Sequence, residues 1–172
     1  ALTAEARATL REELGFSADA FVVAGLSTWP GEEVLLAALV EDLRKHSEAA
    51  VDLLLIPRHA ERRAEVCAAL AAYGRPVFLR SQGGNQAATG HTYVADTTGE
   101  MVRLMQAADM AFIGKTWPPH TDGQTPLEAA ALGLPLCFGP GTANFRSLCE
   151  SLETAGGAVR ITAPAALRIL AA

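Results

Sequence analysis

The chain has 172 residues, of which 50% are hydrophobic and 19% are charged, and its formal net charge is −5. This composition is typical of a globular protein with a sizeable core and excludes an intrinsically disordered chain. The acidic balance argues against a nucleic-acid partner, because such a surface needs clustered Lys and Arg. No apolar stretch approaches the length needed to cross a bilayer, and no signal-peptide pattern opens the chain.

The cysteines and histidines predict neither disulfides nor a metal centre. Cys67, Cys137 and Cys149 are odd in number, widely spaced and set in apolar patterns, which favours a reduced cytosolic compartment and core packing. The four histidines show no metal-ligand spacing such as His-x3-His. We therefore expect no metal and no cofactor.

The first element in chain order is a predicted helix over Thr3–Leu14, closed by Gly15. The chain does not begin with Met and runs directly into this helix, so we expect a piece of a longer protein. Short, nearly continuous apolar runs then alternate with amphipathic segments, a pattern typical of strands covered on both faces. The predicted strands lie at Ala20–Gly25, Val51–Ile56, Pro76–Leu79, His91–Ala95, Asp109–Gly114 and Leu134–Gly139.

Four segments between these runs carry apolar residues at positions i, i+3, i+4 and i+7, which gives each a face that can cover a sheet. They are Leu36–Leu43, Val66–Tyr73, Met101–Ala108 and Leu127–Leu134. The alternation predicts an α/β fold with a Rossmann-like, doubly wound parallel sheet, formed as one domain over residues 1–172. The stretch Ser81–Gly90 (SQGGNQAATG) predicts a mobile loop.

Ligands bind such sheets at the carboxyl ends of the strands, so the polar stretches that follow strands are the candidate sites. The first is Gly25–Glu33, where Ser27 or Thr28 can cap the next helix and Pro30 suits its first turn. A helix start of this kind can bind an anion. Its candidate phosphate or sugar contacts are Ser27, Thr28, Gly31 and Glu32. The alternative is an ordinary capped helix with its two glutamates placed favourably against the helix dipole.

The second stretch, Ile56–Arg62, follows a buried strand. Arg58 stands at the strand's end, where a guanidinium can hold a phosphate through two hydrogen bonds. The alternative is a solvated basic turn in which Arg58 pairs with Glu61.

The third stretch, Asp96–Met101, combines a capping hydroxyl with a glycine. Thr97 or Thr98 can cap the next helix, and Gly99 lets a base or ribose lie against the backbone. Asp96 and Glu100 can also be read as paired carboxylates for acid–base chemistry. Two acids at a helix start are more often a capping arrangement, so we assign them no catalytic role.

The fourth stretch runs from Lys115 to Pro140 and is rich in Gly and Pro at its start. Thr125 is the expected N-cap and Pro126 the expected first helical residue. Glu128 would then lie in the first turn, where it can accept hydrogen bonds from a ribose diol. The alternative is again capping chemistry alone.

In this order, the four stretches resemble the C-terminal domain of the 3-deoxy-D-manno-octulosonic acid (Kdo) transferase family, whose fold is the GT-B glycosyltransferase fold. That family carries Gly-Ser-Thr-His-x-Gly-Glu-Glu and Pro-Arg-His-x-Glu-Arg, which resemble residues 25–33 and 57–62. It also carries Gly-Asp-Thr-x-Gly-Glu-Leu/Met, similar to residues 96–101. Its Gly-Gly-His-Asn-Pro-Leu-Glu and Gly-Pro-His-x-x-Asn-Phe motifs are similar to residues 122–128 and 139–145. The agreement extends from about Leu10 to Leu152.

The resemblance implies a CMP-Kdo donor and a lipid A precursor as acceptor, in lipopolysaccharide assembly. It implies no metal and no catalytic residue in this chain, because the base belongs to an N-terminal acceptor domain that the chain lacks. That missing part would also provide the only membrane contact, at the cytoplasmic face of the bacterial inner membrane, while this domain would be soluble. Matched by motif, the nucleotide contacts are Pro57, Arg58, Gly99, Glu100, Met101, Thr125, Pro126, Leu127 and Glu128.

Some residues depart from the family pattern. Family Gly-Gly-His-Asn is replaced at residues 122–125 by Asp-Gly-Gln-Thr, after a loop that carries one extra residue, and Trp29 and Gly141 each replace a His. Asp122 adds negative charge beside an anionic donor, which is unfavourable unless the carboxylate is solvated or paired. Two alternatives follow: a GT-B transferase that uses a UDP- or GDP-sugar, and a diverged nucleotide-binding module without transfer activity.

Overall fold

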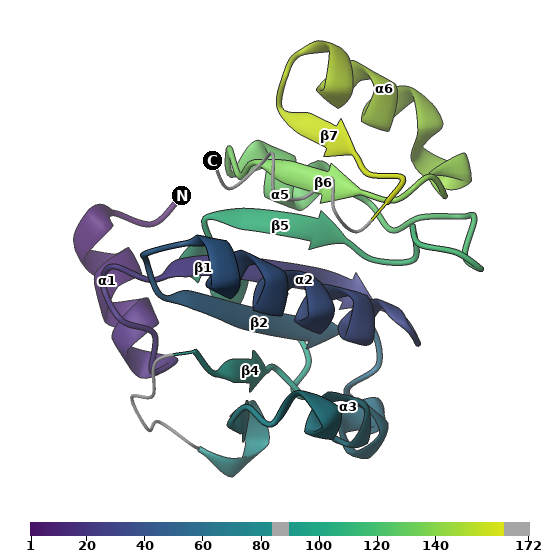
Figure 1. Cartoon of the computed structure of the whole chain (residues 1–172). Helices are drawn as coiled ribbons and strands as arrows, with labels where there is room; N and C mark the ends of the chain where they lie inside the picture. The colour runs from purple at the N-terminus through teal and green to yellow at the C-terminus, as the bar shows by residue number, and fades with distance from the viewer. Residues whose placement is uncertain (84–89, 164–172) are drawn as a thin grey trace.

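The computed structural model describes residues 1–83 and 90–163. Over these residues the chain forms a seven-stranded sheet with the order β3-β4-β2-β1-β5-β6-β7, in which every neighbouring pair is parallel (Figure 1). The strands are β1 (Phe21–Thr28), β2 (Val51–Pro57), β3 (Val77–Leu79), β4 (Thr92–Val94), β5 (Met110–Ile113), β6 (Leu136–Phe138) and β7 (Ala158–Arg160). All six predicted strands and the doubly wound parallel sheet are confirmed, and β7 is an addition.

Helices follow most of the strands, as the predicted alternation requires. The α-helices are α1 (Ala4–Glu13), α2 (Glu32–His46), α3 (Arg63–Leu70), α4 (Met101–Leu104), α5 (Leu127–Ala131) and α6 (Arg146–Thr154). Short 3₁₀ turns extend or precede them: η1 (Ala60–Arg62), η2 (Ala71–Tyr73), η3 (Arg80–Gln82), η4 (Met105–Ala107) and η5 (Ala143–Phe145). The predicted mobile loop begins within η3, and residues 84–89 of it lie outside the described residues.

Each face of the sheet is covered by its own set of helices, which makes three layers. Alternate residues of β1 point to opposite faces: Val22 and Ala24 pack in one core cluster and Val23 in the other. The first cluster receives buried side chains from α1, η4, α5 and α6, among them Leu10, Leu14, Met105, Ala129 and Cys149. The second receives those of α2 and α3, among them Leu36, Leu39, Val40, Leu43, Val66 and Leu70. Burial on both faces explains the nearly continuous apolar runs.

The strand order identifies where a ligand is expected. From β1 the chain moves outward through β2, then returns to place β5 on the other side of β1. This reversal between β1 and β5 is a topological switch point, and the loops after the two strands therefore diverge to opposite faces of the sheet. Loops 28–31 and 114–126 flank this crevice.

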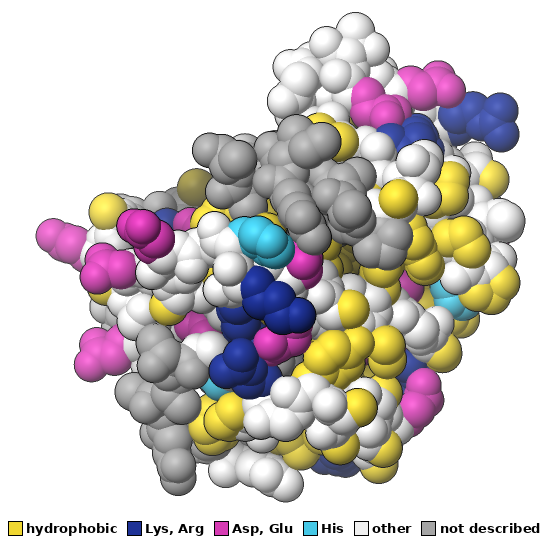
Figure 2. Space-filling view, in the orientation of Figure 1, with side chains coloured by type: hydrophobic (Ala, Val, Ile, Leu, Met, Phe, Trp, Pro, Cys, Tyr) yellow, Lys and Arg dark blue, Asp and Glu magenta, His cyan; other side chains and the backbone are white. Residues whose placement is uncertain are grey.

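The surface carries acidic and basic side chains close together. On the face shown in Figure 2, acidic and basic side chains are interspersed. Among the ion pairs of the described residues, Glu41 pairs with Arg44 and with Arg75, at N–O distances of 2.5 and 2.9 Å. Within residues 1–83 and 90–163, no helix combines the length and apolar character that a bilayer span requires.

An ion-pair network fastens α1 to the elements beside it and makes stability depend on pH. Glu13 accepts hydrogen bonds from Arg103 and from Arg80, the latter at 2.7 Å. The hydrogen bond from Arg103 is the largest influence on Glu13 and lowers its pKa; burial opposes this shift, the bond from Arg80 adds to it, and the pKa falls from 4.5 to about 2. A depressed folded-state pKa adds stability above the unfolded pKa, and this stability is lost as pH falls through the folded value.

We therefore expect Glu13→Gln to lower the free energy of unfolding by about 1 kcal/mol at pH 7, a size set by the partial exposure of this pair network. The difference between variant and wild type should shrink as pH falls from 4.5 towards about 2. Urea denaturation at several pH values measures this. A difference that stays constant over the whole pH range would contradict the assignment.

Candidate functional site

The crevice between β1 and β5 begins at an irregular stretch of backbone. The pairing of β1 with β2 shifts register between Leu26 and Thr28, and Ser27 between them has a φ of 52°. A β-carbon at Gly114, just after β5, would lie 2.1 Å from the Ser27 carbonyl oxygen, so only glycine permits this approach. Lys115 follows with a φ of 58°. Non-glycine residues rarely adopt this left-handed conformation, and those that do cluster at functional sites. Two of them at one switch point make it a candidate functional site.

A pocket of about 320 Å³ opens beside this crevice, near the carboxyl ends of β1, β2 and β4. Its volume is at the lower end of the range for small-molecule sites. Six of the predicted contacts line it: Ser27, Pro57, Arg58, Gly99, Met101 and Glu128. It is completed by Ile56, Ala60, Thr97, Thr98 and Val102, which motif matching did not select. The remaining predicted contacts, Thr28, Gly31, Glu32, Glu100, Thr125, Pro126 and Leu127, do not line this pocket.

Arg58 differs from the arginines that follow it. Arg62 pairs with Glu33 at 2.8 Å, and Arg63 pairs with Asp96 at 3.2 Å. Within the described parts of the chain, the Arg58 guanidinium makes no ion pair with a carboxylate, and the predicted alternative partner Glu61 lies instead beside His59. Arg58 is thus an exposed cation at the pocket wall that is available to an anion.

The loop after β4 is built around Glu100 and Asp96. Glu100 accepts from Arg80 at 2.8 Å and from Thr97 at 2.5 Å, and the bond from Arg80 lowers the pKa of Glu100. Asp96 accepts from the backbone and hydroxyl of Ser81. The prediction that Thr97 or Thr98 caps the next helix is wrong, because Glu100 holds the cap position of α4 and no side chain caps it. Both carboxylates thus have hydrogen-bond partners within the protein.

The start of α5 differs by one position from the prediction: Pro126, not Thr125, holds the cap position, and Leu127, not Pro126, is the first helical residue. The Leu127 N–H donates to the Thr125 hydroxyl at 3.2 Å, and the Ala130 N–H donates to the Pro126 carbonyl. The Thr125 hydroxyl therefore still bonds the first turn of α5, but from one position before the cap. Glu128, in the first turn of α5, lines the pocket.

The start of α2 differs from the prediction that Ser27 or Thr28 caps it. Gly31 holds the cap position in the left-handed conformation, with no side-chain bond. The Thr28 hydroxyl donates instead to Glu33, at 2.8 Å. The reason is that β1 continues to Thr28 and leaves its hydroxyl buried beneath the helix.

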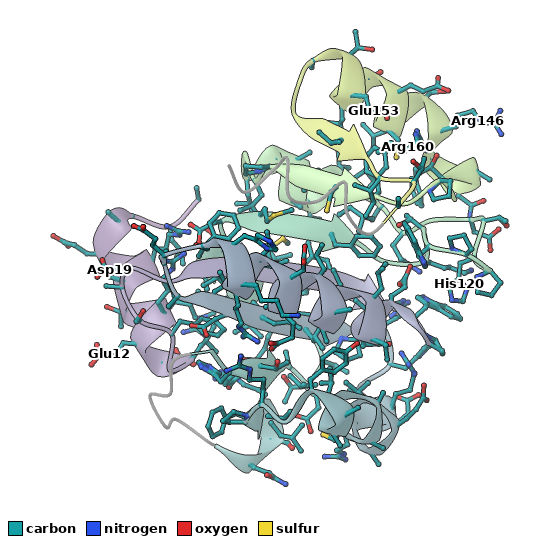
Figure 3. The ribbon with its side chains drawn as sticks, viewed as in Figure 1. Glu12, Asp19, His120, Arg146, Glu153 and Arg160 are labelled. Atoms are coloured by element: carbon teal, nitrogen blue, oxygen red, sulfur yellow. The ribbon has the colours of Figure 1, made fainter. Side chains whose placement is uncertain are left out.

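Aromatic and basic side chains gather beside the pocket, around Trp29. The His59 and His120 rings lie edge-on to it, with centroids at 5.5 and 5.6 Å, and the Lys115 ammonium lies 4.7 Å from the ring centroid. His120 lies beyond the arrowheads of β1 and β5, on the loop that follows β5 (Figure 3). We call this group the Trp29 cluster, with Asp122 as its fifth member.

Comparison with known proteins identifies the family. No family model matches the chain. It is 35% identical over 142 residues to a 3-deoxy-D-manno-octulosonic acid transferase of Bordetella pertussis, covering 81% of this chain and 33% of that protein. It is 30% identical over 146 residues to the transferase of that name from Chlamydophila psittaci, covering 85% of this chain and 33% of that protein. The chain belongs to the Kdo transferase family.

The match to Kdo transferases is partial in length and extends to the fold. The chain spans about a third of the relatives, 33% in both cases above. The C-terminal CMP-Kdo binding domain of WaaA from Acinetobacter baumannii superposes with a TM-score of 0.82 at 24% identity, covering 96% of this chain and 85% of that one. This likeness confirms the Rossmann-like fold.

Two departures from the Kdo transferase pattern have a structural explanation. Asp122 pairs with Lys115 at 2.8 Å, and this contact lowers the pKa of Asp122. Its negative charge is therefore compensated. A β-carbon at Gly141 would lie 2.3 Å from the His120 carbonyl oxygen. The loop after β5 thus occupies the space that a side chain at position 141 would need, which explains why glycine stands there.

Proposed function

We propose that this chain binds the nucleotide of CMP-Kdo and that the whole protein transfers Kdo to a lipid A precursor. The observation that carries the proposal is Arg58, an exposed guanidinium without a carboxylate partner in the described structure, on the wall of a pocket that Gly99 and Glu128 also line. The printed names of the relatives supply the sugar and the reaction.

The charges around the pocket suit a monophosphate better than a diphosphate. Arg58 supplies one cation, which matches the single phosphate of CMP. Lys115, the lysine of the neighbouring Trp29 cluster, already pairs with Asp122 at 2.8 Å. The diphosphate of a UDP- or GDP-sugar would need further cations beside Arg58, and Lys115 is already paired with a carboxylate.

In the proposed reaction this chain holds the leaving group. Arg58 stabilises the negative charge that develops on the CMP phosphate as the bond to the sugar breaks. Glu128 accepts hydrogen bonds from the ribose hydroxyls, and the open backbone beside Gly99 receives the base. The acceptor hydroxyl loses its proton to a carboxylate of an acceptor domain. We assign the contact with the cytoplasmic face of the inner membrane to that same domain.

Calorimetric titration of the 172-residue chain with CMP, and separately with UDP, tests the proposal. We expect CMP to bind at least about tenfold more tightly than UDP, a difference of roughly 1.4 kcal/mol. Because the proposal places the base outside this chain, the chain alone should show no transfer from CMP-Kdo to a lipid A precursor. Binding of UDP without binding of CMP would refute the donor assignment.

A further inference from the structure

Glu32, the first residue of α2, is buried and bound on both oxygens. Its side chain reaches across the switch point, and the residue is only 1% exposed. One carboxylate oxygen accepts from the backbone N–H groups of Thr116 and Trp117, at 2.9 and 3.0 Å. The other accepts from those of Lys115 and Trp29, at 2.8 and 2.9 Å. Four backbone donors from two loops thus converge on one carboxylate.

This arrangement is costly, so it calls for an explanation other than stability alone. A buried carboxylate is strongly disfavoured unless its oxygens are fully bound. Within the described residues, Glu32 has no cationic partner, and only backbone N–H groups compensate its charge. Burial raises the pKa of Glu32, and the four hydrogen bonds oppose that shift. What the carboxylate secures is the relative position of the loop after β1 and the loop after β5.

Those two loops carry four of the five members of the Trp29 cluster; the fifth, His59, follows β2. Trp29 belongs to the first loop and Lys115 to the second, and the ammonium lies 4.7 Å from the ring centroid. The second loop also carries His120 and Asp122. The contacts of Trp29 with Lys115 and His120 therefore span the same two loops that the Glu32 carboxylate joins.

The next residue fastens the loops on the other side. Glu33, 2% exposed, pairs with Arg62 at 2.8 Å and accepts from the Thr28 hydroxyl. The Arg58 N–H donates to the Thr28 carbonyl at 3.0 Å, so Glu33 secures the segment that carries Arg58. Two adjacent glutamates at one helix start therefore brace the loops on both sides of β1.

We propose that Glu32 is a positioning residue of the donor site: without touching the nucleotide, it holds the loops after β1 and β5 at the spacing that donor binding needs. The inference rests on the proposed function, since the site it serves is the proposed nucleotide pocket. Misplacing binding groups by about an ångström is enough to weaken binding or reaction strongly.

The test compares Glu32→Gln with Val40→Ala, a fully buried position in the middle of the same helix. Glutamine is isosteric, but its NH₂ group would face two of the N–H donors. At a temperature where both variants are folded, we expect Glu32→Gln to weaken CMP binding at least about tenfold. Val40→Ala, destabilised only by a core cavity, should bind CMP as wild type does.

A second readout does not depend on nucleotide. The chain has two tryptophans, Trp29 and Trp117, and the backbone N–H of each donates to Glu32. We expect Glu32→Gln to shift tryptophan emission and to increase its quenching by iodide, and Val40→Ala to leave both unchanged. Glu32→Asp, which keeps two oxygens on a shorter side chain, should lie between wild type and Glu32→Gln in both measurements.

The outcomes separate the two proposals. If wild type binds no CMP, the proposed function fails, and the emission and quenching data alone then decide whether Glu32 positions the loops. If wild type binds CMP and folded Glu32→Gln binds equally well, the positioning role is overturned. Should Glu32→Gln fail to fold, Glu32→Asp decides: wild-type affinity and emission in that variant overturn the proposal.

Discussion

Replacing Arg58 by alanine is expected to weaken CMP binding roughly 10- to 100-fold. Hydrogen bonds to a charged group contribute about 1.5–3 kcal/mol, and each 1.4 kcal/mol corresponds to a tenfold change in affinity. The fold should be unaffected, because the contact that Arg58 makes to the loop after β1 uses its backbone N–H, which donates to Thr28 at 3.0 Å and remains in the variant. Titration calorimetry and thermal melting measure the two effects separately.

Arg146 provides the matched control. It is also exposed, and it lies at the start of α6, where Figure 3 shows it pointing away from the sheet. Arg146→Ala removes the same charge but should leave CMP affinity within about twofold, because long-range effects of an exposed charge are screened by salt. Equal weakening in the two variants would mean that only overall charge matters and that Arg58 is not a phosphate contact.

The sequence was most informative where burial dictates pattern. Strands covered on both faces must be apolar at nearly every position, so β1, β2 and β5 could be predicted from their runs alone. The edge strand β7 escaped prediction, because only Ala158 of its three residues is buried. Helix α6 was not among the predicted elements, although apolar residues at 145, 148, 149 and 152 follow the helical period.

The candidate site was predictable in outline because loops after parallel strands meet at one edge of the sheet. The hydrogen bonds and ion pairs within the site were not predictable, because they join residues that are distant in the sequence. Glu32 was predicted as a phosphate or sugar contact, yet its partners on the loop after β5 lie 83 to 85 positions away. Likewise, nothing in the spacing of the sequence predicts that Lys115 neutralises Asp122. Local pattern finds the loops, and tertiary contacts decide which side chains remain free for a ligand.

The largest expected loss of stability comes from Asp109→Asn, just before β5. Asp109 accepts from Arg11 at 2.6 Å, from Arg7 at 2.8 Å and from the Val22 N–H at 2.7 Å. Arg11 is buried, with its other N–H groups bound to backbone carbonyls. Losing the carboxylate leaves that charge uncompensated, which costs about 3 kcal/mol. The melting temperature should fall by roughly 6–12 °C.

Asp19→Asn is the control, because Asp19 is an exposed carboxylate at the same end of the molecule (Figure 3). It should change the free energy of unfolding by less than about 0.5 kcal/mol. Both variants should bind CMP as wild type does at low temperature, because Asp109 precedes β5, whereas the residues that line the pocket follow the strands. If Asp109→Asn melts like Asp19→Asn, α1 is not held by this ion pair. If instead Asp109→Asn melts early and also loses CMP affinity while folded, the amino ends of the strands are coupled to the site at their carboxyl ends. That result would contradict the expectation that this variant affects stability alone.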